Sequence, residues 1–137
     1  MRAAALVLWI VCCITVVFAQ ESEADTASSS FQCTVLYPEN AEYSSVSTAG
    51  DTVKFRLFYV DNVCSGFSYG FSQKENTLLV RRTTDSPDTC TPDEQILYGV
   101  EGFIAHLPKG KYLFELQTGT PGNRFESIFR EVAVVKK

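Results

Sequence analysis

The apolar residues of this chain follow the pattern of short β-strands separated by turns. The clearest strand signal lies in residues 51–60. Alternate positions of that segment carry large apolar side chains: Val53, Phe55, Leu57 and Tyr59. Alternation with a period of two is typical of a strand that buries one face. No segment shows sustained helical periodicity, so the sequence predicts an all-β fold.

Further segments combine β-branched or aromatic residues with turn signals on either side. They are residues 31–37, 67–71, 76–82, 95–106, 111–117 and 125–135. Short strands at this spacing favour an immunoglobulin-like β-sandwich of six to eight short antiparallel strands. We expect the segment 95–106 to be broken or bulged at Gly99 and Gly102, because glycine weakens a strand interior.

The first nineteen residues have the composition of a secretory signal peptide. Arg2 gives a basic start, residues 3–18 are apolar apart from Thr15, and Ala19 is a small residue at the cleavage position. We therefore predict that residues 1–19 are removed and that the protein is secreted to the extracellular space. An uncleaved signal anchor is the alternative. It is disfavoured because the apolar run is shorter than the roughly 20 residues that span a bilayer, so we expect no stable membrane insertion.

Residues 20–30, which read QESEADTASSS, are acidic, serine-rich and free of large apolar side chains. Such a segment cannot bury apolar surface, so we predict a disordered spacer. Residues 31–137 then form the single β-sandwich domain. Cleavage would leave 11 basic and 16 acidic residues, a formal net charge of −5. This charge argues against nucleic acid and anionic membranes as partners, since both require clustered positive charge.

Three cysteines remain after cleavage: Cys33, Cys64 and Cys90. In an oxidising compartment one pair should form a disulfide, and it can form in three ways. We favour Cys64–Cys90, because both cysteines lie in turn-rich sequence that flanks one strand-like segment. Cys33 is then a free cysteine. We expect it to be buried in the first strand of a monomer; an intermolecular disulfide is the alternative.

Residues with catalytic or metal-binding chemistry are few. His106 is the only histidine, which excludes sites built from two imidazoles. It precedes a Pro turn at a predicted strand end, and we expect it to be solvated rather than to act as a catalytic base. The sequence therefore predicts no catalytic residue, no cofactor and no enzymatic activity.

Carboxylates crowd the segment around Cys90. They are Asp85, Asp88, Asp93 and Glu94. Calcium prefers six to eight oxygen ligands, so this segment is a candidate calcium loop. It lacks the alternating Asp or Asn spacing and the glycine of a dedicated loop. We therefore expect a solvated acidic turn and no metal site.

One aromatic segment allows two interpretations. Phe67, Tyr69 and Phe71 share one face of a predicted strand, and Gly70 lies between the last two. The alternation favours a core strand. A ligand-facing patch on the surface is the alternative.

The turn at residues 107–110 reads Leu-Pro-Lys-Gly and is followed at once by Tyr112. This spacing resembles the tyrosine corner of immunoglobulin-like sandwiches, in which a tyrosine hydroxyl ties a corner loop. Residues 107–135 also resemble the closing strands of polycystic-kidney-disease-type repeats and of MD-2-related lipid-recognition domains. Both resemblances imply a β-sandwich and assign no functional residue.

The sequence favours a secreted, non-enzymatic, extracellular interaction or matrix protein, with an unidentified extracellular protein or matrix component as partner. The alternative is a carrier that binds a lipid or small apolar ligand between the two sheets, and an inhibitor of extracellular proteases comes third. A carrier needs an apolar cavity of about 300 Å³ or more, whereas an interaction module has a filled core.

Overall fold

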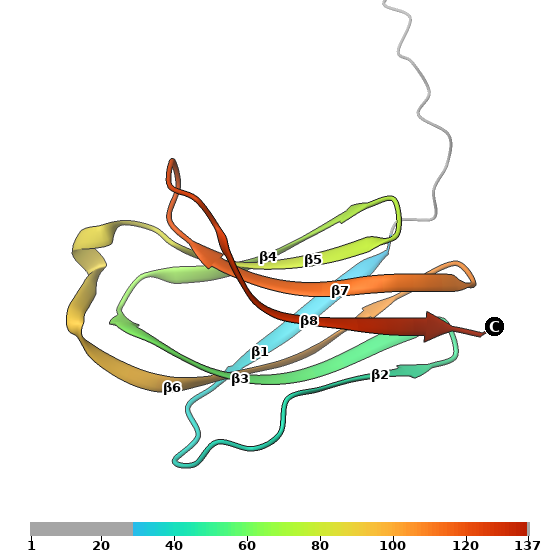
Figure 1. The fold of residues 1–137 in the computed structure, drawn as a ribbon, viewed down its shortest axis with the longest axis horizontal. Coiled ribbons are helices and arrows are strands. Elements are labelled where there is room, and N and C mark those ends of the chain that lie inside the picture. The colour runs from blue at the N-terminus through green and yellow to red at the C-terminus, as the bar shows by residue number, and fades with distance from the viewer. Residues whose placement is uncertain (1–28, 137) are drawn as a thin grey trace, which may run out of the picture.

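The strands form two layers, as the alternation of apolar and polar residues in the sequence predicts (Figure 1). The computed structural model describes residues 29–136. The strands and the one short 3₁₀ helix are β1 (Ser30–Leu36), β2 (Ser45–Ala49), β3 (Thr52–Cys64), β4 (Phe67–Lys74), β5 (Thr77–Thr84), η1 (Pro87–Thr89), β6 (Cys90–Ala105), β7 (Gly110–Gly119) and β8 (Glu126–Val135). The predicted all-β sandwich is confirmed.

Each layer is a four-stranded sheet. The first sheet has the order β1-β6-β3-β2, and the second has the order β4-β5-β7-β8. The number of strands agrees with the prediction, but their length does not. Strand β3 has 13 residues and β6 has 16, so the central strands of the first sheet run the whole length of the sandwich.

The prediction that all strands pair antiparallel is wrong for β5 and β7. These strands lie parallel, with Thr77 opposite Leu113 and Thr83 opposite Gly119. Parallel neighbours need a crossover connection, which is most often a helix. Here the crossover is a strand, because the chain leaves β5, crosses to the first sheet as β6 and returns to the second as β7.

The predicted irregularities in 95–106 are also wrong. Gly99 and Gly102 pair in register with Phe58 and Phe55. The irregularity of β6 lies before this segment, at residues 92–94, which have no partner on β3 because Gln95 pairs with Asn62 and Thr91 pairs with Val63. Gly102 instead permits close approach, because the ring of Phe55 and neighbouring backbone of β1 occupy the space that a Cβ would need.

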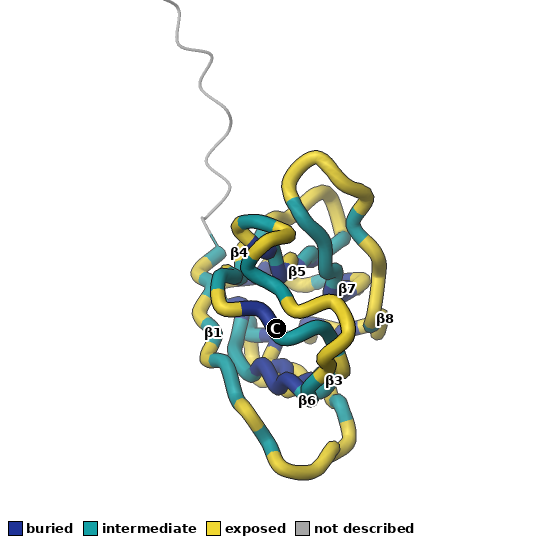
Figure 2. Tube along the Cα trace, turned by 90° about the vertical axis from the view of Figure 1, so that its left-hand side faces the viewer, coloured by how far each residue is buried: buried dark blue, intermediate teal, exposed yellow. Residues whose placement is uncertain are grey.

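The core lies between the sheets, and most of its buried residues are aromatic or branched. Figure 2 marks the buried stretches of the strands in dark blue. The ring centroids of Phe55 and Phe114, which come from opposite sheets, are 5.1 Å apart. Phe31 stacks on Phe71 across the sandwich at 5.4 Å. Tyr69 also packs against this core, which supports the core interpretation of the segment that contains Tyr69 and Phe71.

One end of the sandwich, which we call the corner end, holds the β6–β7 turn. The hydroxyl of Tyr112 donates a hydrogen bond of 2.7 Å to the carbonyl of Pro108. Tyr112 is buried, and Leu107 of the same turn is 2% exposed. The predicted bond of the tyrosine corner is therefore present.

The predicted signal peptide (1–19) and residues 20–28 of the predicted spacer lie outside the described residues. Strand β1 begins at Ser30, one residue before the predicted start of the domain. Between residues 29 and 136, no helix has the length and hydropathy needed to span a membrane.

Candidate functional site

The end of the sandwich opposite the corner end contains a disulfide, and we call it the disulfide end. Cys64 and Cys90 are bonded, which is the pair favoured from the sequence. They lie opposite one another on β3 and β6, two neighbouring strands of the first sheet. The disulfide therefore ties one sheet internally, and the loop that it closes contains β4, β5 and η1.

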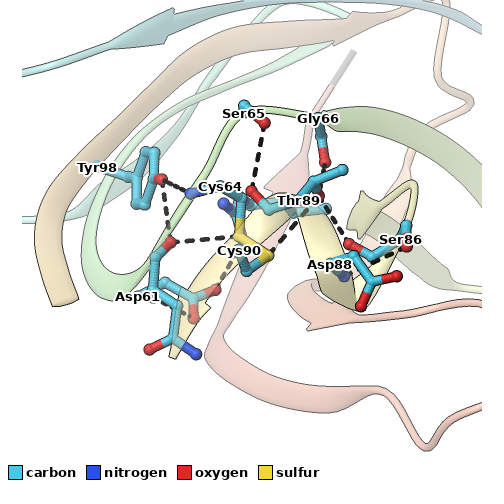
Figure 3. The surroundings of a disulfide bond; sticks show 11 residues. Asp61, Cys64, Ser65, Gly66, Ser86, Asp88, Thr89, Cys90 and Tyr98 are labelled. Carbon is cyan, nitrogen blue, oxygen red and sulfur yellow. Dashed lines mark hydrogen bonds and ion pairs between the residues drawn. A yellow bond between two sulfur atoms is a disulfide. The ribbon is translucent and has the colours of Figure 1, made fainter. Parts of the chain in front are cut away.

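Hydrogen bonds fasten η1 to the β3–β4 turn next to the disulfide (Figure 3). The amide of Ser65 donates to the carbonyl of Thr89 at 2.9 Å. The hydroxyl of Thr89 in turn donates to the carbonyl of Ser86 at 2.7 Å. These bonds hold the connection between the two sheets in a defined position.

The buried hydroxyl of Tyr98 bridges two backbone groups of β3 opposite the bulge in β6 (Figure 3). It donates to the carbonyl of Asn62 at 3.0 Å and accepts from the amide of Cys64 at 3.1 Å. A bulge leaves ladder groups without their usual partners, and the tyrosine hydroxyl supplies replacements for two of them. Tyr98 is therefore a structural residue of the disulfide end.

Arg82 is the most unusual residue of this end, because it is a charged side chain that is only 1% exposed. Its Nη1 lies 2.8 Å from Oδ2 of Asp61, across the gap between the sheets. Its guanidinium carbon lies 4.4 Å from the ring centroid of Phe67 and 4.5 Å from that of Tyr98. One carboxylate and two ring faces thus compensate the buried cation.

Two nitrogens of this guanidinium, Nε and Nη2, have no hydrogen-bond partner within residues 29–136. The buried hydroxyl of Thr84, two residues further along β5, also has none in that range. A buried polar group without a partner costs about 1–3 kcal/mol. Each group of this kind in a native protein calls for an explanation, such as a bound water, an ion or a functional role.

Arg82 and Thr84 both line a cavity of about 130 Å³, which we call the Arg82 cavity. The disulfide and polar residues of both sheets complete its wall, among them Asp61, Thr118 and Thr120. Asp61 keeps 28% of its side chain exposed, whereas Arg82 is 1% exposed.

A pair of tyrosines, one from β3 and one from β4, joins the two sheets. The hydroxyl groups of Tyr59 and Tyr69 are hydrogen-bonded to one another. Burial raises the pKa of Tyr69 to about 12 and raises the pKa of Tyr59 as well. Both tyrosines are therefore neutral at physiological pH, and their role is structural.

Cys33 is free and half-buried on the edge strand β1. Its side chain packs against the core cluster, as the alternation of β1 predicts. Burial raises the pKa of its thiol, which lowers the fraction of reactive thiolate. The monomeric state remains a prediction.

The residues with candidate chemistry do not gather in one place. His106 is exposed at the corner end, with its Nδ1 3.7 Å from Oδ2 of Asp51. The acidic segment around Cys90 lies at the disulfide end, and Asp85 and Asp88 are exposed. In the part of the chain that the structure describes, no group of three or more His, Cys, Asp or Glu residues is placed to hold a metal ion.

The sequence analysis missed Arg82 and Asp61. A signal for Arg82 existed in β5, where Leu78 and Val80 alternate with exposed or half-buried positions. Two consecutive arginines follow, so one of them must face inward. Continued alternation places Arg82, rather than Arg81, on the same face as Val80.

Comparisons with protein-family models, with curated protein sequences and with solved structures found no match to this chain.

Proposed function

We propose that this is a secreted, non-enzymatic protein that acts in the extracellular space as a monomer, by binding another protein or a matrix component. The observation that carries the proposal is the filled core. Phe55 and Phe114 meet between the sheets, and Phe31 and Phe71 stack beside them. Because these rings occupy the middle of the sandwich, binding is left to its surface and its ends.

The same observation weighs against the carrier. The cavity between the two sheets at the disulfide end measures about 130 Å³ and is lined by charged and hydroxyl side chains. A site for a lipid or another apolar ligand needs about 300 Å³ or more of mostly apolar lining. The interaction module is thus the better-supported of the two functions.

Secretion is supported by the signal-like composition of residues 1–19 and by the Cys64–Cys90 disulfide. Disulfides persist in oxidising compartments and are rare in the cytosol. The proposal therefore includes removal of the leader before the domain reaches the extracellular space.

We also propose that the sandwich is immunoglobulin-like. The bond from Tyr112 to Pro108 supports this, because it is the bond of a tyrosine corner. Two features distinguish this chain from the antibody domains. Its disulfide joins neighbours in one sheet, and β5 pairs with β7 in parallel.

Expression of the full chain in a secreting eukaryotic cell tests the function. We expect the protein in the medium, with an N-terminus within a few residues of Gln20. Native mass spectrometry should give the mass of one oxidised chain without lipid. Cross-linking in the tissue of origin should join it to an extracellular protein or matrix component. Retention in the membrane fraction with Met1 intact would overturn secretion, and co-purified lipid would favour the carrier.

A further inference from the structure

The connection between β1 and β2, residues 37–44, projects from the sandwich below the first sheet in the view of Figure 1. It has no regular secondary structure, and residues 39–43 are all exposed. Tyr43 is 96% exposed, which makes it the most exposed large hydrophobic residue in the described part of the chain. Its phenol, and the backbone that precedes it, are therefore accessible to a modifying enzyme.

The other tyrosines are less accessible than Tyr43. Tyr37, at the start of the same connection, is 64% exposed, and its ring centroid lies 5.9 Å from that of Tyr98. The remaining four lie within the sandwich, where their hydroxyls are hydrogen-bonded: Tyr59, Tyr69, Tyr98 and Tyr112. Tyr43 is therefore the phenol that an enzyme reaches most easily.

The charges near Tyr43 in the sequence are all negative. Glu42 precedes it directly, Glu39 lies four residues before it, and no lysine, arginine or histidine occurs in residues 3–53. In the fold, Nη2 of Arg56 lies 3.4 Å from Oε2 of Glu42. About half of each of these two side chains is exposed (49% and 59%). Exposed ion pairs of this kind are weak, so Glu42 remains available to another cation.

We propose that Tyr43 is a site of tyrosine O-sulfation. A sulfotransferase binds an anionic donor, an adenylyl sulfate, so its active site presents cations, which favour a tyrosine with acidic neighbours. The phenolic oxygen of Tyr43 attacks the sulfur of the donor and forms the new O–S bond. The bond from sulfur to the bridging oxygen breaks, and the adenosine phosphate leaves with that electron pair. The phenolic proton passes to a base of the enzyme.

This inference rests on the proposed function, because tyrosine sulfation takes place in the lumen of the secretory pathway. It also deepens that function. A sulfate ester adds a negative charge and oxygen acceptors to a connection that already carries Glu39 and Glu42. Arginine binds such groups through paired, charge-assisted hydrogen bonds. The sulfated connection thus fits a partner that presents arginine side chains.

The test is the mass of the mature chain from the medium of secreting eukaryotic cells, grown with and without chlorate, which blocks synthesis of the donor. We expect a form heavier by one SO₃ group, which is absent with chlorate and in Tyr43→Phe. Tyr37→Phe is the matched control and should retain the added group. A secreted chain without the added mass, or with a phosphate that a phosphatase removes, would overturn the proposal.

An assay that does not depend on secretion separates this proposal from the proposed function. Oxidised protein refolded from bacteria is incubated with a tyrosylprotein sulfotransferase and a labelled donor. We expect no labelling of Tyr43→Phe, and a rate about two- to fivefold lower in Glu42→Gln, the range for the loss of one exposed charge contact. Glu126→Gln is the control, because Glu126 is exposed on β8, and its rate should equal that of the wild type.

The outcomes of this assay are decisive. Equal labelling of Tyr43→Phe and the wild type would refute the site. An unchanged rate in Glu42→Gln would refute the selection of Tyr43 by its acidic neighbours. Normal labelling of a chain that cells do not secrete would overturn the proposed secretion and leave Tyr43 as the preferred acceptor.

Discussion

The two ends of the sandwich join the same pair of sheets by different interactions. At the corner end and in the middle, apolar side chains such as Phe55 and Phe114 meet across the gap. At the disulfide end, the bonds across the gap are polar, between Tyr59 and Tyr69 and between Arg82 and Asp61. Truncation of a buried apolar side chain costs stability in proportion to the apolar volume that is removed. Removal of one member of a buried polar pair also leaves the other member buried without a partner. Residues of equal burial therefore differ in what their removal costs.

A large loss of stability should follow a deletion in the apolar part. Phe114 is 0% exposed and touches Phe55 and Phe129. We expect Phe114→Ala to reduce the free energy of unfolding by about 3–5 kcal/mol, because it leaves a cavity among rings that cannot move far. Urea denaturation measures this. Leu113→Ala, at the exposed neighbouring position, is the control, and an equal loss there would contradict the assignment of the core.

The ion pair at the disulfide end should respond unequally to removal of its two members. Asp61→Ala leaves the buried Arg82 without its counter-ion, and we expect a loss of about 3–5 kcal/mol. Arg82→Met leaves a carboxylate that is 28% exposed and remains solvated, so we expect a loss of about 1–2 kcal/mol. Urea denaturation of both variants gives the order. A greater loss in Arg82→Met would mean that ring stacking, and not the ion pair, holds this end together.

The double variant Cys64→Ala/Cys90→Ala lacks the disulfide. We expect its free energy of unfolding to be lower by about 3 kcal/mol, because its unfolded chain regains conformational entropy. Thermal unfolding under oxidising conditions measures the shift. Cys33→Ala is the control and should change the midpoint much less, since Cys33 forms no disulfide. A comparable shift in that variant would indicate that Cys33 takes part in a covalent bond in solution.

The tyrosine pair should have no effect on the pH dependence of stability at neutral pH. Burial raises the pKa of Tyr69 to about 12 in the folded state, while an unfolded tyrosine titrates near pH 10. Its contribution is therefore complete below about pH 10 and is lost as the pH rises through about 12. Unfolding curves between pH 8 and 12 should show this fall, and it should be smaller in Tyr69→Phe. An identical fall in the variant would exclude the pair as its source.

Local patterns in the sequence predicted most of the fold. The strand that contains Val53, Phe55 and Leu57 buries these residues as its alternation requires. The hydrogen bond from Tyr112 to the turn at residues 107–110 was predictable because the tyrosine follows that turn directly in the sequence. The Cys64–Cys90 pairing followed from turn-rich sequence around each cysteine. In each case the signal lies within a few residues of the structure that it specifies.

Features that depend on distant segments were not predictable in this way. The parallel pairing of β5 with β7 depends on where β6 crosses, and neither strand encodes its partner. In the sequence, nothing distinguishes Asp61 from other polar residues near a strand end. Its role follows only from the fold, in which Nη1 of Arg82 on β5 lies 2.8 Å from its Oδ2. The Arg82 cavity needs residues from both sheets, so no single stretch of sequence reveals it.

The position of the disulfide has a consequence for proteolysis. Residues 65–89 lie inside the loop that Cys64 and Cys90 close. A protease that cuts in this stretch, for example at the exposed Glu75 of the β4–β5 turn or at Asp88 of η1, would break the chain without releasing a fragment. Exposed turns are preferred sites of nicking. The cut protein would migrate as one species without reductant and as two with it, so an extracellular protease acting here would alter the chain while its two parts remain covalently joined.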